Sequence, residues 1–249
     1  MGNQKGTGRT IAVSALKAES QTLQQHVNQL DLAVSGMGNV AVDNCLEELT
    51  TQNISGLISW GVCGALKPEL KPGDLLIPKT VMNQSKQTFE CDDIWRREIL
   101  TTLPSPQRNS SSKSTVHSAF TDSIITDSKT VLTTPATKMD LAESSSADAV
   151  DMESFTIAKF ADQHSIPFVI IRAVIDTVDD TLPSASAFRP GQSSASVNTL
   201  FSAISRPAQW PALIRTGGQF KTALASLNRL ADSSINALCM PSNQASKQA

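Results

Sequence analysis

The chain has 249 residues, 40% of them hydrophobic, which is enough to bury the core of one large α/β domain or of two small ones. A formal net charge of −2, the absence of tyrosine and an aromatic content of 4% argue against a nucleic-acid partner. Four scattered cysteines favour a reducing, cytoplasmic location over a disulfide framework. The three histidines lie far apart, so we predict no metal site.

Strands and helices are predicted to alternate along the first part of the chain. The predicted strands are 11–16, 32–34, 54–60, 74–77, 116–120, 123–126 and 168–176, of which 116–120 and 123–126 are expected to pair. The predicted helices are 19–30, 39–50 and 135–144, and residues 149–183 form a strand–helix–strand unit. Residues 104–114, rich in Ser and Pro, are expected to be a mobile loop.

This alternation predicts an α/β fold, with a single domain at 10–183 built on a central, mainly parallel, mixed twisted sheet flanked by helices. After Pro183 the pattern becomes helical over 196–204, 208–215 and 219–231, with breaks at Pro207 and at Gly217-Gly218. We therefore expect a helical C-terminal extension at 184–235, packed on the domain, and a disordered tail at 236–249.

Two acids stand where an open α/β sheet binds its ligands, outside the carboxyl ends of the strands. Strand 168–176 is apolar on both faces and ends at Asp176, and Glu153 opens the helix before it. Arg172 and Asp176 interrupt the apolar pattern, and their spacing of four places them on one face. An internal ion pair, or a cap on the next turn, would explain Asp176. A general acid whose pKa is raised in a dry pocket would explain it as well.

The other candidate residues also allow two interpretations. Glu153 is favoured by the helix dipole, as Asp151 is, but it could equally accept hydrogen bonds from a diol such as ribose. The glycines of Gly36-Met37-Gly38 and of Gly61-Val62-Cys63-Gly64 form plain turns or allow the backbone to approach a ligand. Cys63 is expected to be a small buried thiol, because no base accompanies it in the sequence.

Five segments occur in the order of a known family. The segments 150–154 (VDMES) and 167–176 (PFVIIRAVID) resemble the V-E-M-E and P-F-x-x-x-R-x-x-S-D signatures of the nucleoside phosphorylase and methylthioadenosine/S-adenosylhomocysteine nucleosidase superfamily. Segments 35–38 (SGMG), 61–66 (GVCGAL) and 72–78 (PGDLLIP) are similar to its other landmarks. The resemblance covers about residues 10–183 and implies an enzyme that cleaves a nucleoside N-glycosidic bond.

The resemblance implies a role for each candidate residue. Asp176 would protonate the leaving purine at N7, and Glu19 would orient the attacking water. Glu153 would bind the ribose hydroxyls, with Met152 against the sugar. The remaining substrate-lining positions would be Gly36, Met37, Gly61, Val62, Cys63 and Gly64, and the base would contact residues near 126–131. Because bond cleavage builds positive charge on the ribose and negative charge on the base, a carboxylate and an acid on the two sides stabilise both.

Two departures from the family favour water over phosphate as the nucleophile. Val62 stands where phosphorylases often place Ser or Thr to hold phosphate, and no Arg occurs in that segment. Glu19 would repel a phosphate dianion, at a cost of about 4 kcal/mol per pair of charges at about 4 Å and a surface-like dielectric. No cofactor is implied, and phosphate would enter only as the co-substrate of a phosphorylase.

Within the superfamily, the chain is similar to the hopanoid-associated phosphorylases of bacteria. The pointers are Asp151, Ser154, the segment 134–138 (TPATK) and the segment 206–215 (RPAQWPALIR). This similarity implies release of adenine from a lipid-linked nucleoside, adenosylhopane. Trp210, Leu213 and Ile214 lie between basic residues, so residues 206–216 either contact a membrane peripherally or form a short helix packed on the domain.

Two other functions stay open at this point. One is a methylthioadenosine/S-adenosylhomocysteine nucleosidase or a general purine nucleoside phosphorylase. The other is a nucleoside-binding protein without catalysis, against which the joint presence of Glu19, Glu153 and Asp176 argues. The superfamily also implies a homo-oligomer whose subunits complete each other's sites.

Overall fold

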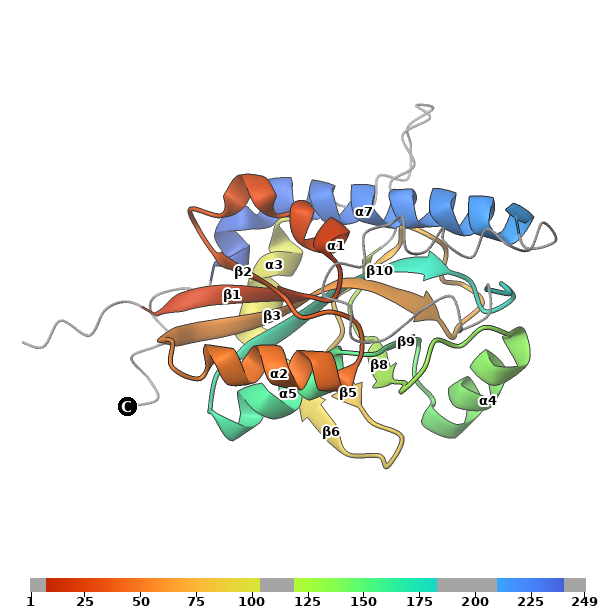
Figure 1. The fold of residues 1–249 in the computed structure, drawn as a ribbon, viewed down its shortest axis with the longest axis horizontal. Helices are drawn as coiled ribbons and strands as arrows, with labels where there is room; N and C mark the ends of the chain where they lie inside the picture. Colours follow the sequence, from red (N-terminus) through yellow and green to blue (C-terminus); the bar gives the residue numbers. More distant parts are fainter. Residues whose placement is uncertain (1–7, 104–118, 183–209, 240–249) are drawn as a thin grey trace, which may run out of the picture.

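A ten-stranded sheet organises the computed structural model, which describes residues 8–103, 119–182 and 210–239 (Figure 1). The strands are β1 (Arg9–Ser14), β2 (Asp31–Val34), β3 (Ile54–Ala65), β4 (Leu75–Leu76), β5 (Thr80–Met82), β6 (Thr88–Glu90), β7 (Ala119–Phe120), β8 (Ile124–Asp127), β9 (Ala149–Asp151) and β10 (Phe168–Asp176). The helices are α1 (Lys17–Gln21), the 3-10 turn η1 (Gln24–His26), α2 (Asn39–Leu49), α3 (Asp93–Thr101), α4 (Pro135–Ser145), α5 (Ser154–Gln163) and α7 (Trp210–Leu238).

Strand β3 lies at the centre of the sheet and pairs in parallel with β1 on one side and β10 on the other. Beyond β1 comes β2, also parallel, and the far end of β3 pairs antiparallel with β9. From β9 the sheet continues through β8 and β5 to β6. The sheet is therefore mixed with a parallel centre, and the predicted fold class is confirmed.

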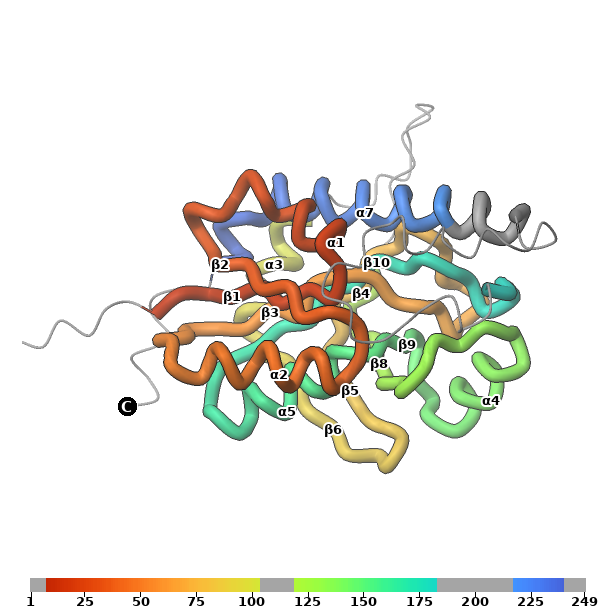
Figure 2. The backbone as a smooth tube through the Cα atoms, viewed as in Figure 1, coloured from red at the N-terminus to blue at the C-terminus, as the bar shows by residue number. Residues whose placement is uncertain are grey.

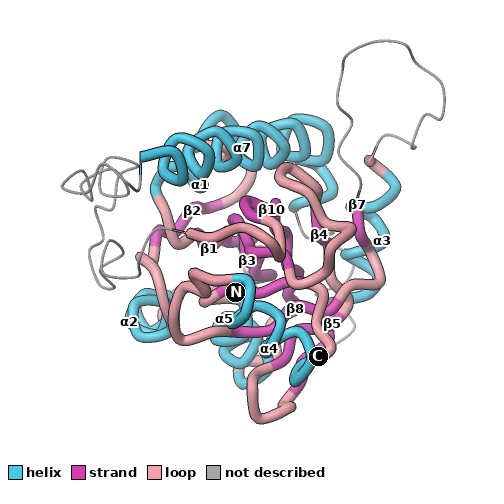
Figure 3. The backbone as a smooth tube through the Cα atoms, turned by 90° about the vertical axis from the view of Figure 1, so that its right-hand side faces the viewer, coloured by secondary structure: helices cyan, strands magenta, loops and turns pink. Residues whose placement is uncertain are grey.

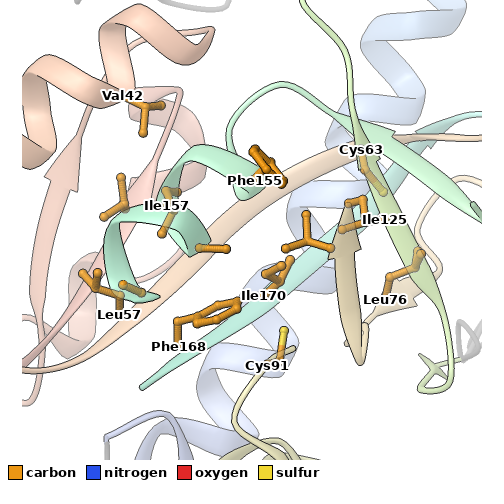
Figure 4. Packing of buried hydrophobic residues seen from close by; sticks show 14 of the residues in the cluster. Val42, Leu57, Cys63, Leu76, Cys91, Ile125, Phe155, Ile157, Phe168 and Ile170 are labelled. Atoms are coloured by element: carbon orange, nitrogen blue, oxygen red, sulfur yellow. The ribbon is translucent and has the colours of Figure 1, made fainter. Parts of the chain in front are cut away.

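Helices cover both faces of the sheet, and each face has its own core. Helices α2 and α5 pack on one face, where Val42, Phe155 and Ile157 meet strand residues such as Leu57 and Ile170 (Figure 4). Helices α3 and α7 cover the other face (Figure 3). Trp95 of α3 and Leu227 of α7 belong to the second core. Because β3 and β10 are buried on both sides, their sequences are apolar without alternation.

The predicted turn at Gly61–Gly64 is wrong, because these residues lie within β3, which continues to Ala65. Neither glycine has a positive φ, unlike Gly36 and Gly38 at +89° and +88°. Glycine inside a strand marks a close approach of another group to the backbone. The group that approaches is described with the site below.

The predicted pairing of 116–120 with 123–126 is also wrong. The described part of the first segment, β7, pairs with β4, and β8 pairs with β5 and β9. The backbone N–H of Ile77 donates to the carbonyl of Phe120 at 3.0 Å, and that of Lys79 to the carbonyl of Ser123 at 3.1 Å. The chain therefore runs alongside β4 and β5 instead of folding back on itself. Residues 104–118, which contain the predicted mobile loop, lie outside the described residues.

The predicted helix at 19–30 is divided into α1 and η1. The hydroxyl of Thr22 donates to the carbonyl of Glu19 at 2.6 Å and accepts a hydrogen bond from the Trp60 indole at 2.9 Å. A threonine that bonds to the backbone in this way competes with helix continuation. Strands β5 and β6, with only three residues each, were not predicted, and neither was the nine-residue helix α3.

Helix α7 passes through Gly217-Gly218 without the predicted break (Figure 2). Two glycines cost a helix about 1 kcal/mol each, but Phe220, Ala223 and Leu227 bury their side chains next to them. The helix contacts β10, β3 and α3, so it is part of the core. It also extends to Leu238, three residues into the predicted disordered tail. Residues 183–209 and 240–249 lie outside the described residues. The predicted boundaries of the domain, the C-terminal extension and the tail therefore stay predictions.

None of the helices within the described ranges has both the length and the hydropathy needed to cross a bilayer.

Candidate active site

Two glycines of β3 make room for acidic side chains. The register of β3 with β10 sets Gly61 opposite Arg172 and Gly64 opposite Asp176, with an irregularity between Val174 and Asp176. A β-carbon at Gly61 would lie 2.6 Å from Oε1 of Glu19 and would also collide with the guanidinium of Arg172. A β-carbon at Gly64 would lie 3.3 Å from Oδ1 of Asp176. An alanine at Gly61 would therefore force Glu19 and Arg172 to move, whereas an alanine at Gly64 would need a shift of only a few tenths of an ångström in Asp176.

Glu19 is held rigidly above Gly61 although α1 is short. Its Oε2 accepts the backbone N–H of Leu16 at 2.8 Å, and its Oε1 accepts that of Val62 at 2.9 Å. The residue is buried, and this burial raises the pKa of its carboxyl, while the Arg172 guanidinium and the two backbone hydrogen bonds oppose the rise. A buried carboxyl of this kind can take up a proton from a neighbouring molecule.

Arg172 connects the acids around Glu19. Its Nε lies 2.7 Å from Oδ2 of Asp151, and its Nη2 lies 3.9 Å from Oε2 of Glu153. Nη2 also donates to the hydroxyls of Ser59 at 2.7 Å and Ser154 at 3.0 Å. Nη1 is buried beside Gly61 and has no hydrogen-bond partner within the described ranges. The Nη1 group of Arg172 and the carboxyl of Glu19 therefore both lie beside Gly61.

Glu153 is the N-cap residue of α5, which agrees with its predicted place at the start of that helix. Its Oε1 accepts the backbone N–H of Gly38 at 2.9 Å, which joins the loop after β2 to this site. The pKa of Glu153 is raised to about 7: burial is the main cause, the Arg172 charge opposes the rise, and the nearby Asp151 and Glu19 add to it. The Met152 methyl lies 3.7 Å from where a β-carbon of Gly38 would be, and Met37 is half-buried beside that glycine.

Asp176 pairs with Lys138 of α4 and not with Arg172. The Lys138 ammonium donates to Oδ2 of Asp176, and both side chains are buried. Burial raises the pKa of Asp176 to about 6, against the lowering effect of the Lys138 charge. One interpretation of the sequence was that Asp176 forms an internal ion pair. The structure contains such a pair, but its cation, Lys138, was not predicted. The turn after β10 is capped by Asp180, whose Oδ2 accepts the Thr177 N–H at 2.8 Å.

Both glycines lie in the C-terminal part of β3, three residues apart, so their β-carbons would point to opposite faces of the strand. Cys63 lies between them, buried, and burial raises the pKa of its thiol well above its usual value. The thiol is therefore not a nucleophile. No group of three or more His, Cys, Asp or Glu side chains in the described ranges could hold a metal ion.

The structure adds Arg172 and Lys138 to the candidate residues. An arginine in a strand that is apolar on both faces was a usable signal, because a buried guanidinium must be paired. Lys138 gave no such signal, since a lysine in a helix is ordinarily exposed. Of the predicted base-contacting segment, Asp127 lies near Asn39 and Asp151, and burial raises its pKa.

We expect Gly61→Ala to lower kcat/KM at least 100-fold, because the new methyl group would displace Glu19 and Arg172. Overpacking of this kind also lowers the free energy of unfolding by about 1–3 kcal/mol. Gly218→Ala is the matched control: nothing lies within 4 Å of its β-carbon, so the helix should be stabilised by about 1 kcal/mol with activity unchanged. Steady-state kinetics and urea unfolding would measure both effects, and a fully active Gly61→Ala variant would contradict the geometry.

Comparison with known proteins identifies the family and the fold of the chain. The profile of the family described as "Phosphorylase superfamily" matches residues 14–204, whereas no curated protein matches the chain. The methylthioadenosine/S-adenosylhomocysteine nucleosidase of Neisseria meningitidis superposes with a TM-score of 0.69 at 18% identity, covering 92% of this chain and 99% of that one.

Two proteins of Helicobacter pylori have the same fold. Its methylthioadenosine/S-adenosylhomocysteine nucleosidase has a TM-score of 0.68 at 12% identity, with 93% of this chain and 99% of that chain covered. Its futalosine hydrolase has a TM-score of 0.68 at 12% identity, with 92% and 98% covered. The family match confirms an enzyme of the nucleoside phosphorylase or nucleosidase type, as the sequence predicts. The chain belongs to the phosphorylase superfamily.

Proposed function

We propose that the protein hydrolyses the N-glycosidic bond of an adenine nucleoside that carries a large apolar 5′ substituent, with adenosylhopane as the expected type of substrate. The observation that carries this proposal is the pair of buried carboxyls with raised pKa values, Glu19 and Asp176, beside Gly61 and Gly64 in the C-terminal part of β3. Ligands of open α/β sheets bind outside the carboxyl ends of the strands, where a nucleoside would meet both acids.

In this proposal each acid acts on one part of the nucleoside. Asp176 protonates N7 of the adenine as the base leaves, which a carboxyl with a raised pKa can do. Glu153 accepts hydrogen bonds from the ribose hydroxyls, with Met152 against the sugar, and stabilises the positive charge on the ring. Gly36, Met37, Gly61, Val62 and Gly64 line the remaining surface.

The charges around Gly61 support water as the nucleophile. A water molecule within hydrogen-bond reach of both groups would donate to Oε1 of Glu19 and accept from Nη1 of Arg172, which has no hydrogen-bond partner among the described residues. A phosphate dianion would instead meet Glu19, Asp151 and Glu153, with the Arg172 charge already paired to Asp151 at 2.7 Å. Phosphate is therefore not the expected co-substrate, despite the family description.

The apolar 5′ substituent is proposed on the sequence resemblance to the hopanoid-associated group. Of its pointers, Asp151 and Ser154 both contact Arg172, and Ser154 donates to Asp151 as well. Segment 206–216 would be where a lipid tail or a membrane surface meets the protein. The proposal includes a cytoplasmic enzyme with peripheral membrane contact that assembles as a homo-oligomer.

The test offers methylthioadenosine and a 5′-dodecylthio adenosine, each with and without 10 mM phosphate. Adenine release gives the rate, and the mass of the sugar product identifies the nucleophile. We expect a free 5′-substituted ribose, and a kcat/KM at least tenfold higher for the long chain, since two buried methylenes of about 0.8 kcal/mol each suffice. Preference for methylthioadenosine would indicate a small-substrate nucleosidase, and no turnover of either by folded protein would indicate a binding protein.

A further inference from the structure

Lys138 of α4 is buried at the carboxyl end of β10, with 1% of its surface exposed. Its ammonium donates to Oδ2 of Asp176, to the carbonyl of Thr177 and, at 3.4 Å, to the carbonyl of Asp180. These three acceptors use all three N–H groups of the ammonium. The side chain therefore has one fixed orientation, and it joins α4 to β10 and to the turn that follows.

Packing alone does not explain a lysine in this position. Removing an ammonium and a carboxylate from water costs several kcal/mol per ion, and hydrophobic residues of similar volume are often no less stable. The residues before Asp176, Val174 and Ile175, have no polar side-chain group that could hold its carboxyl. The carboxyl is therefore fixed from another element, across 38 residues of sequence.

We propose that Lys138 is a positioning residue for Asp176: its ammonium fixes one carboxyl oxygen, Oδ2, and leaves the other, Oδ1, for the leaving base. This inference rests on the proposed function of Asp176 as the acid. Lys138 itself does not touch the substrate. It acts by setting the orientation of the carboxyl and its affinity for a proton.

Because Lys138 is charged, a positioning role predicts a shift in the pKa of Asp176 and in the pH dependence of activity, which a purely structural role does not. The titratable groups that face Asp176 are Lys138 on α4, Asp180 in the following turn and Cys63 on β3. Of these, Lys138 lowers the pKa of Asp176 and Asp180 raises it. Removing the ammonium raises that pKa, so the carboxyl keeps its proton to higher pH. An acid that must be protonated loses activity as pH rises through its pKa, so this alkaline loss should move to higher pH.

The experiment compares Lys138→Met with Lys138→Arg and with Lys159→Met, which removes an exposed lysine from α5 as the matched control. In Lys138→Met we expect kcat to fall roughly 10–100-fold with KM within about threefold, and the alkaline limb to move up by about one pH unit. Lys138→Arg keeps the charge with a different geometry, so its kcat should fall while the alkaline limb stays in place. Lys159→Met should behave as the unchanged protein.

A second measurement does not depend on turnover. A carbon-13 titration of the aspartate carboxyls, with Asp176 assigned through Asp176→Asn, should show a higher pKa for Asp176 in Lys138→Met and an unaltered one in Lys138→Arg. If Lys138→Met does not fold, Lys138→Arg alone decides: wild-type kcat in that variant would overturn the proposal, as would an unmoved Asp176 titration in folded Lys138→Met. If the unchanged protein releases no adenine, the proposed function fails, while the titration still reports whether Lys138 controls Asp176.

Discussion

Replacing Asp176 with asparagine is expected to lower kcat/KM for adenine release by roughly 10²–10⁴-fold, the usual contribution of a general acid. The amide can still accept the hydrogen bond of Lys138 through its oxygen, which preserves the contact that the carboxyl makes. Its nitrogen can donate a hydrogen bond to the base but cannot transfer a proton. The loss should therefore appear in kcat. The melting temperature should also fall, because the buried Lys138 ammonium loses its counter-charge, and stopped assays of adenine release beside a thermal melt would measure both effects.

The pH dependence provides a second check on Asp176. Its pKa is about 6, so the protonated form that can act as an acid is depleted above that pH. In the unchanged protein, kcat/KM should fall as pH rises through this value, and in Asp176→Asn this fall should be absent. Asp179→Asn, three residues away and exposed, is the matched control and should retain wild-type kinetics. Residual activity within tenfold of wild type in Asp176→Asn would remove Asp176 from the acid role.

The parts of the fold that follow from periodicity could be predicted from the sequence. Helix α2 has apolar residues spaced at one face, and the continuous apolar stretch of β10 indicated a strand covered on both sides. Short edge strands such as β5 and β6 could not be predicted, because three residues carry no usable period. The Gly61–Gly64 segment was misjudged because a glycine that makes room for a side chain looks the same in sequence as a glycine in a turn.

Only those site residues whose position follows from their immediate neighbours in the sequence could be predicted. Asp176 and Glu153 lie in one continuous unit, and their places at a strand end and a helix start followed from that unit. Lys138 lies 38 residues before Asp176, and nothing in its own helix indicates that it is buried. Nη1 of Arg172 is buried without a hydrogen-bond partner in the described part of the chain, and this follows from the packing of β3, β10 and α1, which no local sequence pattern contains.

Replacing Glu19 with glutamine should identify the nucleophile, because Glu19 affects water and phosphate in opposite directions. If water attacks, Glu19 takes up its proton, and the variant should lose roughly 10²–10⁴-fold in kcat. If phosphate attacks, loss of the Glu19 charge removes a repulsion of about 4 kcal/mol per pair of charges at about 4 Å, so phosphate should bind more tightly and the rate should rise. We expect the loss, with no response to added phosphate.

The glutamine is also close enough to glutamate in shape to keep the result interpretable. Its oxygen can accept from Leu16 or from Val62, but its NH₂ group would face the other N–H, which costs about 1–3 kcal/mol of stability. Glu47→Gln, an exposed change on α2, controls for loss of a charge. A phosphate-dependent rate in Glu19→Gln that exceeds the wild-type rate, with ribose 1-phosphate as the sugar product, would make the protein a phosphorylase in mechanism as well as in family. A free 5′-substituted ribose as product, and a loss that phosphate does not relieve, would mean that Glu19 acts by activating water.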